Sequence, residues 1–339
     1  MKALVYEGPR QMNLRDVEVP SLERTDVLVE VACSGICGSE LSGYLGQNSL
    51  RVPPVIFGHE FAGTVTEVGD GVTRFKVGDR VTANPLATCG ACRYCKGGRQ
   101  QLCANRRLLS ASLPGSNAQY VKVNERFVYA LPPSLTFEQG ALTEPVACAV
   151  RAVESAGVSP NHTVLVMGMG PIGQLILQVL RLHGVNQVMV ADTNPLRLEQ
   201  ARRLGAYAVN PSEQDILAEL QAFSDGMGVD AAFDAVGNNI TRECCISAVT
   251  SGGAVVFTGL HEAVSNLPIN DMIRKEIRTM GAFAYSTLNF ELALRYLSEG
   301  RVGFQGGVVS APLSEGEQWF KRLLGQAGEV TKVLLRPQD

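Results

Sequence analysis

The sequence predicts an α/β protein of two domains, one built on a doubly wound parallel sheet and the other rich in β-strands. Three features of the chain indicate this fold class. A glycine-rich turn follows an apolar run at residues 163–167, and strand-like and helix-like segments alternate from there to residue 284. Short, partly alternating runs that predict strands occur earlier, at residues 2–7, 12–19, 27–32, 61–68 and 80–83. A chain of 339 residues also exceeds the size at which single hydrophobic cores stop growing.

The glycine-rich turn has the spacing of a phosphate-binding loop. Gly168, Gly170 and Gly173 form a G-x-G-x-x-G pattern directly after the apolar run. The first glycine permits a sharp turn, the second lets a pyrophosphate approach the backbone, and the third lets helix and strand pack closely. The N-terminus of the following helix would face the phosphates with unpaired N–H groups.

An acid completes this pattern. Asp192 ends the next apolar run, where its carboxylate can accept hydrogen bonds from an adenosine ribose. A strand before the glycines, a helix after them and an acid at this distance together predict a dinucleotide site. The alternative is a glycine-rich turn that binds no ligand.

The alternation of strands and helices continues after this turn. We expect helices at residues 195–204 and 216–223, and strands at residues 229–234, 253–258 and 277–283. Because this sheet is complete by residue 284, we assign the later elements to the β-rich domain: helices at 288–299 and 315–324 and a strand at 330–335. The predicted domains are therefore residues 1–146 with 285–339, and residues 147–284.

Four cysteines lie close together in the β-rich domain. Cys89, Cys92, Cys95 and Cys103 form a C-x2-C-x2-C-x7-C pattern. Four thiolates in one loop suit a closed tetrahedral zinc site, which has no open coordination position and is therefore structural. The competing interpretations are two disulfides, which an odd total of nine cysteines disfavours, and an iron–sulfur cluster, which usually serves electron transfer.

A second metal site is predicted from residues that are distant in sequence: Cys37, His59, Glu60 and Glu144. Cys, His and carboxylate are all zinc ligands, and three of them leave a position open for water or substrate. A single histidine is more often a hydrogen-bonded loop or core residue. His59 stands directly before Glu60 and is one of only four histidines. Spacing alone leaves open whether His59 is a metal ligand or a hydrogen-bonded residue.

Composition and charge exclude several classes of function. The net charge is −3 and there is no basic block, so nothing indicates nucleic acid as a partner. The N-terminus lacks the apolar core of a signal peptide, and no stretch approaches the roughly 20 apolar residues that span a bilayer. We expect a cytoplasmic protein with no membrane partner.

These motifs resemble those of the zinc-dependent medium-chain alcohol and polyol dehydrogenases, in the branch of the sorbitol and threonine dehydrogenases, over essentially the whole chain. The run Gly58-His59-Glu60-x2-Gly63-x5-Gly69-x2-Val72 is similar to the zinc signature of this family. The four-cysteine loop resembles its structural zinc lobe, and the glycine turn with Asp192 resembles its NAD motif. The resemblance implies a GroES-like catalytic domain, a Rossmann domain, one catalytic and one structural zinc, and NAD.

The resemblance also implies roles for single residues. Cys37 and His59 match catalytic zinc ligands, Glu60 matches the acid beside that histidine, and Ser39 matches a hydroxyl that relays the substrate proton. Glu144 stands where this branch has a glutamate near the zinc. We expect Glu144 to bind zinc directly or through water, and either to exchange with Glu60 during turnover or to leave one of the two acids outside the direct ligands; the alternative is a helix cap. The implied cofactor contacts are Gly168, Gly170, Pro171, Ile172, Gly173, Asp192, Arg197, Gly237, Gly259, Leu260 and Lys332.

The chain departs from the family pattern in the proton relay. Many members carry a histidine three residues after the relay hydroxyl, whereas this chain has Ser42, which has no proton affinity near neutral pH. A relay through Ser39, the nicotinamide ribose and water remains open. Cys148, one helical turn after Glu144, is expected to be an apolar core thiol.

The predicted function is hydride transfer between NAD and a polyol, sugar alcohol or other secondary alcohol. One alternative is a simple alcohol or L-threonine-type dehydrogenase. Another is a non-catalytic NAD-binding structural or sensor relative, which would lack Cys37, His59 or Ser39, all of which are present. The only other expected partner is a second copy of the chain, in a homo-oligomer (dimer or tetramer) whose sheets meet at the apolar strand expected at residues 277–283.

Overall fold

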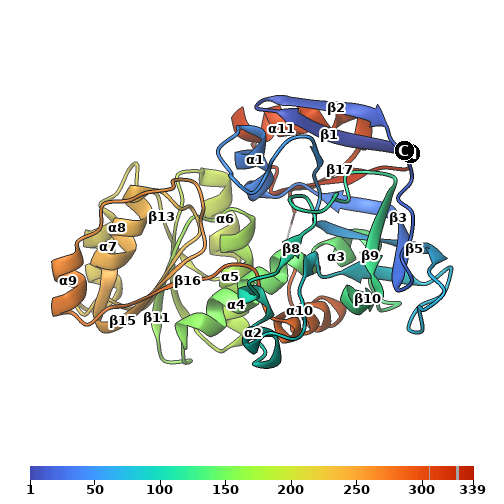
Figure 1. The fold of residues 1–339 in the computed structure, drawn as a ribbon. Helices are drawn as coiled ribbons and strands as arrows, with labels where there is room; N and C mark the ends of the chain where they lie inside the picture. The colour runs from blue at the N-terminus through green and yellow to red at the C-terminus, as the bar shows by residue number, and fades with distance from the viewer. Residues whose placement is uncertain (305, 326–327) are drawn as a thin grey trace. The chain divides into compact units, whose positions relative to one another are not determined.

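The computed structural model describes residues 1–304, 306–325 and 328–339 (Figure 1). They form two compact units. The first unit comprises Met1–Glu144 and Ser286–Asp339, and the second comprises Pro145–Tyr285. The first unit is therefore made of two separate segments of the chain, whereas the second is continuous.

The second unit is built on a six-stranded parallel sheet with the order β13-β12-β11-β14-β15-β16. Its strands are β11 (Thr163–Met167), β12 (Gln187–Ala191), β13 (Tyr207–Val209), β14 (Val229–Asp234), β15 (Val249–Phe257) and β16 (Arg278–Gly281). After β13 the chain crosses to β14, on the other side of β11, so the switch point of the sheet lies between β11 and β14. Folds of this kind bind ligands at such a switch point, at the carboxyl ends of the strands. The predicted fold class is confirmed.

Helices cover both faces of this sheet, with α5 and α6 on one side and α7 and α8 on the other (Figure 1). The helices of the second unit are α5 (Pro171–Leu182), α6 (Pro195–Arg203), α7 (Ile216–Phe223), α8 (Asn239–Ala248) and α9 (Ile269–Arg274), and α4 (Thr143–Ala156) begins two residues before the unit does. Because both faces are covered, Val164, Leu165 and Val166 of β11 are fully buried.

The turn between β11 and α5 requires glycine for two different reasons. Gly168 has a φ of +90°, and a Cβ there would also lie 2.5 Å from Cγ2 of Val236. A Cβ on Gly173 would collide with the carbonyl oxygen of Gly168. Gly170 is the N-cap of α5 and Pro171 its first residue, a position at which proline loses no hydrogen bond.

The first unit contains a seven-stranded sheet with the order β10-β6-β5-β3-β18-β17, in which β9 also pairs with β3, and smaller sheets β2-β1-β4 and β7-β8. Its strands are β1 (Lys2–Gly8), β2 (Gln11–Asp16), β3 (Asp26–Gly35), β4 (Val55–Ile56), β5 (Glu60–Val68), β6 (Arg80–Ala83), β7 (Leu86–Ala87), β8 (Arg107–Leu108), β9 (Tyr120–Asn124), β10 (Val128–Ala130), β17 (Val308–Pro312) and β18 (Lys332–Arg336). Its α-helices are α1 (Gly38–Tyr44), α2 (Arg93–Lys96), α3 (Phe137–Ala141), α10 (Thr287–Ser298) and α11 (Gly316–Gly325). Short 3-10 helices lie at η1 (Gln100–Leu102), η2 (Glu125–Phe127) and η3 (Leu313–Glu315).

Strand β3 lies in the interior of the large sheet and joins the two segments of the first unit. Its residues Val27, Val29 and Val31 are fully buried in a valine-rich core. Its far end pairs antiparallel with β18, where Gly35 lies opposite Leu334. This pairing brings the last strand of the chain beside the start of α1. Among the described residues, no helix combines the length and the apolar composition that crossing a membrane requires.

Candidate active site

Cys37, His59 and Glu60 come together in the first unit. Their potential ligand atoms, one from each residue, all lie within 4.8 Å of one another. Cys37 is the N-cap of α1, His59 immediately precedes β5, and Glu60 is the first residue of β5. The pairing of β3 with β5 sets Gly35 opposite Glu60, and so brings the chain leading into α1 to the start of β5.

The backbone before His59 and an acid behind it fix the imidazole. Gly58 has a φ of +102°, and a Cβ there would lie 2.6 Å from Oγ of Ser116. His59 is 5 % exposed, and its Nδ1 lies 2.7 Å from Oε1 of Glu40. A hydrogen bond from Nδ1 to a carboxylate leaves Nε2 available to a metal, and it increases the basicity of the ring.

Glu40 is the acid that orients His59, and the sequence did not reveal it. The side chain is fully buried and also accepts hydrogen bonds from the Gly58 amide at 2.8 Å and the Ser110 hydroxyl at 2.6 Å. Burial raises the pKa of Glu40, but the charge and hydrogen bond of His59, the charge of Arg51 and the Ser110 hydrogen bond outweigh burial and lower the pKa to about 2. Glu40 is therefore a carboxylate at every pH at which the protein would work.

The surroundings of His59 favour a positive charge. Burial lowers the pKa of His59, but the nearby Glu40 carboxylate and Cys37 thiolate outweigh burial and raise that pKa well above its ordinary value. A proton is one way to supply the positive charge, and a bound metal cation is another.

The Glu60 carboxylate is almost fully buried, at 1 % exposure. Its Oε1 has no hydrogen-bond partner among the described residues, and its Oε2 forms an ion pair with Nζ of Lys332. Gly35 makes room for it, because a Cβ on that glycine would collide with Oε2. A buried carboxylate oxygen without a hydrogen-bond donor, next to a thiol and an imidazole, fits a zinc ion.

Lys332 lies in the first unit beside these groups. It is 3 % exposed, and besides its ion pair with Glu60 it donates a hydrogen bond to the carbonyl of Ile36 at 3.0 Å. Burial lowers the pKa of Lys332, but the negative charges of Glu60, Cys37 and Glu144 outweigh burial and raise it. The structure shows Lys332 as the counter-ion of Glu60, and the cofactor contact that the resemblance implied for Lys332 stays a prediction.

Glu144 lies in the first turn of α4 and is 8 % exposed. It acts electrostatically on Lys332, together with Glu60 and Cys37, but it is not one of the three residues whose ligand atoms lie within 4.8 Å of one another. Cys148 likewise belongs to neither of the two metal-binding groups found among the described residues.

Ser39 lies in α1, next to the metal-binding group. Its hydroxyl donates to Sγ of Cys37 at 3.4 Å and accepts a hydrogen bond from Nη2 of Arg51 at 3.0 Å. The hydroxyl of Ser42, at the position of the absent histidine, donates to the carbonyl of Gly38 at 3.4 Å. Ser39 is thus beside the proposed zinc ligands, and Ser42 is bonded back to its own helix.

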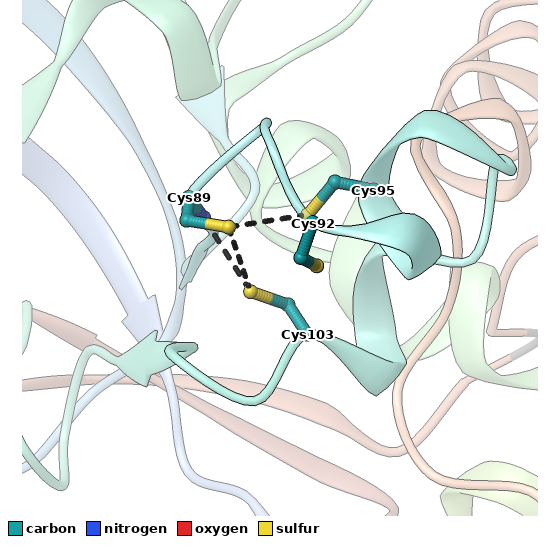
Figure 2. A group of neighbouring side chains, drawn as sticks. All are labelled: Cys89, Cys92, Cys95 and Cys103. Carbon is teal, nitrogen blue, oxygen red and sulfur yellow. Dashed lines mark hydrogen bonds between the residues drawn. The ribbon is translucent and has the colours of Figure 1, made fainter.

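The four-cysteine loop converges on one point (Figure 2). The sulfur atoms of Cys89, Cys92, Cys95 and Cys103 lie within 4.8 Å of one another, with Sγ of Cys89 at 3.5 Å from that of Cys103 and 4.0 Å from that of Cys95. All nine cysteines are free, which argues against the disulfide interpretation. The backbone amides of Ala91 and Cys92 lower the pKa of Cys89 to about 6, and the Cys95 amide lowers the pKa of Cys92, so both favour the thiolate form that binds zinc. Burial instead raises the pKa of the Cys95 thiol to about 11.

The glycine turn in the second unit presents an acid at its edge. The Asp192 carboxylate accepts hydrogen bonds from the backbone amides of Met169 and Asn194, both at 2.7 Å. Nη1 of Arg197 lies 3.7 Å from Oδ2 of Asp192, and also 3.9 Å from the point where a Cβ of Gly170 would stand. Asp192 therefore holds the turn in place, with a basic side chain next to it.

Gly237 and Gly259 follow the ends of β14 and β15. Their backbones are so close that a Cβ on either residue would collide with the other, and Gly237 has a φ of +91°. Arg242 of α8 donates to the carbonyls of Gly259 and Glu262 and to the Ser265 hydroxyl, which holds the loop after β15. Leu260 in this loop is 63 % exposed. These glycines and Asp192 share the carboxyl edge of one sheet, the edge at which such folds bind nucleotides.

Known proteins resemble the chain along its whole length. Residues 23–133 match the alcohol dehydrogenase GroES-like domain, and residues 171–299 match the zinc-binding dehydrogenase domain. Sorbitol dehydrogenase of Bacillus subtilis is 34 % identical over 99 % of this chain and 97 % of its own. The structure of 2R,3R-butanediol dehydrogenase from Bacillus subtilis has a TM-score of 0.90 and 31 % identity, and it covers 99 % of both chains. An Escherichia coli alcohol dehydrogenase solved with NADH has a TM-score of 0.91 and 28 % identity, with 99 % of both chains covered.

The metal-binding groups and the parallel sheet define a zinc-dependent, nicotinamide-dependent oxidoreductase that acts on CH–OH groups. The chain belongs to the zinc-dependent medium-chain alcohol and polyol dehydrogenase family.

Proposed function

We propose that the enzyme oxidises a secondary alcohol group of a polyol or sugar alcohol with NAD, at a zinc ion held by Cys37, His59 and Glu60. The observation that carries this proposal is the buried group of these three residues, with Glu40 hydrogen-bonded to the imidazole. The sorbitol and butanediol dehydrogenases among its relatives support the substrate class.

Each residue of the site has a distinct task in this reaction. When bound, zinc supplies Lewis acidity that lowers the pKa of an alcohol. Ser39 accepts the proton of the substrate hydroxyl. Glu40 holds His59 in one tautomer and orientation. Lys332 forms an ion pair with Glu60, and its ammonium gives the site one net positive charge when zinc, the Cys37 thiolate and the Glu60 carboxylate are together.

The nucleotide site is proposed at the glycine turn of the second unit. NAD, when bound, supplies the hydride acceptor. The chain's contribution is the helix N-terminus at Gly170, Pro171 and Ile172, which faces the phosphates, and Asp192, which accepts from a ribose hydroxyl. Gly237, Gly259 and Leu260 are proposed as further contacts because they lie at the same edge of the sheet.

We also propose a second role for acids at the zinc. With zinc bound, Glu144 would approach the metal directly or through water, and either the two acids would exchange during turnover or one of them would stay outside the direct ligands of the metal. Its charge already acts on Lys332, the partner of Glu60, which supports a shared site. The four cysteines of the loop at residues 89–103 are proposed to hold the structural zinc.

Beyond the site, we propose a homo-oligomer, either a dimer or a tetramer, that works in the cytoplasm. Nine free thiols are typical of a reducing compartment. Strand β16 ends the parallel sheet and has a free edge within that sheet, which supports pairing with a second copy.

The test is a panel of sorbitol, xylitol, arabitol, butanediol, simple alcohols and threonine, each with NAD, with reduced nicotinamide followed by absorbance. We expect turnover with polyols or other secondary alcohols to exceed that with ethanol. A clear preference for threonine would favour the L-threonine-type alternative. No reduction with any substrate, in protein that holds zinc and binds NADH, would support a non-catalytic relative and refute the proposal.

A further inference from the structure

A buried arginine beside the site lowers the pKa of Glu40 by its charge but has no part in the proposed reaction. Arg51, in the loop after α1, is 5 % exposed, and it forms no ion pair with any described residue. Nη1 donates to the Ser110 carbonyl, Nη2 donates to Oγ of Ser39 at 3.0 Å, and Nε has no hydrogen-bond partner in the described part of the chain. Burying a guanidinium without a directly paired acid is costly, so its position requires an explanation.

The fold makes specific room for this side chain. Gly43 lies in α1 opposite the arginine, and a Cβ there would stand 2.6 Å from Cγ of Arg51. The φ of Gly43 is not positive, so the backbone does not require glycine at this position. The guanidinium carbon lies 5.5 Å from the centre of the Phe57 ring, within the range of a cation–π interaction. The glycine and the aromatic ring together fix where the guanidinium can lie.

The hydrogen bond to Ser39 limits what that hydroxyl can do. A serine hydroxyl has one proton to donate and two lone pairs to accept with, whereas a guanidinium has donors and no acceptor. Ser39 therefore cannot donate toward Arg51. The Ser39 hydroxyl donates its own proton to Sγ of Cys37 at 3.4 Å. One lone pair of Oγ accepts from Arg51, so the other lone pair is left to accept a proton.

We propose that Arg51 is a positioning residue of the proton relay, which holds Ser39 with one lone pair directed at the substrate hydroxyl. This inference rests on the proposed role of Ser39. In the relay, the substrate O–H bond breaks as a new O–H bond forms at Oγ of Ser39, and the original Ser39 proton leaves to water. Arg51 keeps its own protons throughout, because a guanidinium stays charged in proteins.

Arg51 also stabilises the negative charge that grows on Oγ of Ser39 while its proton leaves. The nearby Ser42 does not stabilise this charge, because its hydroxyl donates its hydrogen bond to the Gly38 carbonyl. Among the described side chains, Arg51 is the cation that hydrogen-bonds Ser39.

The test compares Arg51→Lys with the matched control Arg80→Lys. Arg80 also lies in the first unit, donates to a backbone carbonyl (that of Leu135) and stands over a phenylalanine ring (that of Phe137). Lysine keeps the positive charge near Glu40 but lacks the two guanidinium nitrogens that donate to Ser110 and Ser39 at the same time. We expect Arg51→Lys to lower kcat by about 10- to 100-fold with little change in KM, and the control to leave both unchanged.

Two further measurements separate positioning from a general structural effect. The solvent deuterium isotope effect on kcat should rise in Arg51→Lys, because proton transfer becomes slower than hydride transfer. In a Ser39→Ala background, Arg51→Lys should have no further effect, since the proposed action passes through Ser39. Zinc content and melting temperature should match those of the unaltered protein.

Gly43→Ala provides an independent variant if Arg51→Lys folds poorly. It leaves the guanidinium intact but displaces its stem, so it should lower kcat and raise the solvent isotope effect in the same way. The proposal is overturned if the Arg51 variant retains kcat, if it loses zinc as the cause of inactivity, or if its effect is equally large without Ser39. An unaltered protein that reduces no NAD would instead refute the proposed function.

Discussion

His59 illustrates how residues beyond the metal ligands prepare a site for metal. Glu40 receives three hydrogen bonds around one carboxylate oxygen, from the amide of Gly58, the ring of His59 and the hydroxyl of Ser110. The imidazole is consequently held before any metal binds. Mutation of a residue that hydrogen-bonds a metal ligand commonly lowers metal affinity or activity by roughly 10- to 100-fold.

The low pKa of Glu40 predicts how the acid stability of the protein depends on this carboxylate. Its pKa is about 2 in the folded chain against an ordinary value of 4.5, so the unfolded chain binds a proton first as the pH falls. The stabilisation is therefore fully present above pH 4.5 and is lost progressively as the pH falls toward 2. Glu40→Gln should lower the unfolding free energy at pH 7, and denaturant titrations should show the gap to the unaltered protein narrowing below pH 4.5. A gap that stayed constant down to pH 3 would contradict the assignment.

Glu144→Gln tests whether this acid serves the metal or the helix. If Glu144 approaches zinc, the variant should lose turnover by about 10-fold or more, and zinc content measured on the same sample should fall if the contact is direct. Unchanged zinc and rate with a lower melting temperature would show that Glu144 caps α4 instead.

Asp192→Ala tests the choice of cofactor. A hydrogen bond to a charged group contributes about 1.5–3 kcal/mol, so NADH titrations should show roughly 10- to 150-fold weaker binding. The change also removes the acceptor for the Met169 and Asn194 amides, so melting temperature has to be measured alongside. Without Asp192 beside it, Arg197 can bind a 2′-phosphate, so the affinity for NADP relative to NAD should increase in this variant. Equal efficiency with both cofactors in the unaltered protein would refute the role of Asp192.

Spacing within one segment was enough to predict some single residues, whereas Cys37, His59 and Glu60 needed the resemblance to a family in addition. The glycine turn and the four cysteines are of that kind. Glu40, Arg51 and Lys332 gained their significance from contacts between distant segments, since Glu40 meets Ser110 and Lys332 meets Glu60. An acid in the third position of α1 was a weak signal for Glu40, and nothing in the local sequence marked Arg51.

At the scale of elements, hydrophobic periodicity located the long, regular pieces well. Helix α7 and strand β14 begin and end where they were expected, and the strand expected at residues 277–283 is the shorter β16. Helices α1 and α8 were not predicted. Helix α1 holds Gly38, Ser39, Ser42 and Gly43 within seven residues, a composition that favours turns in isolation, and it is stabilised by its contact with α11.

The four-cysteine loop is the element whose stability depends most on metal. Its short pieces α2 and η1 span four and three residues, too little to stay folded by themselves. We expect two zinc ions per chain, one for each metal-binding group. Mild chelation should remove the catalytic ion first, with loss of activity and retention of circular dichroism, because the loop site is closed. A fully active protein with one zinc per chain would contradict this order.

At the scale of the whole molecule, oligomerisation remains a prediction. The edge of β16 and apolar side chains near it, such as Ile273 at 68 % exposure, favour an interface between two copies. Light scattering at micromolar concentration should give the mass of a dimer or tetramer. A charged pair of substitutions in this region, Thr279→Lys with Ile273→Glu, should reduce that mass, and a monomeric unaltered protein would refute the idea.

The pairing of β18 with β3 has a consequence for biosynthesis. The second unit is continuous and can fold as soon as residue 285 has left the ribosome. The first unit cannot, because its large sheet includes β18, which is made after all the other strands of that sheet. The carboxylate of Glu60 therefore gains its ammonium partner only after β18 has been made and has paired with β3.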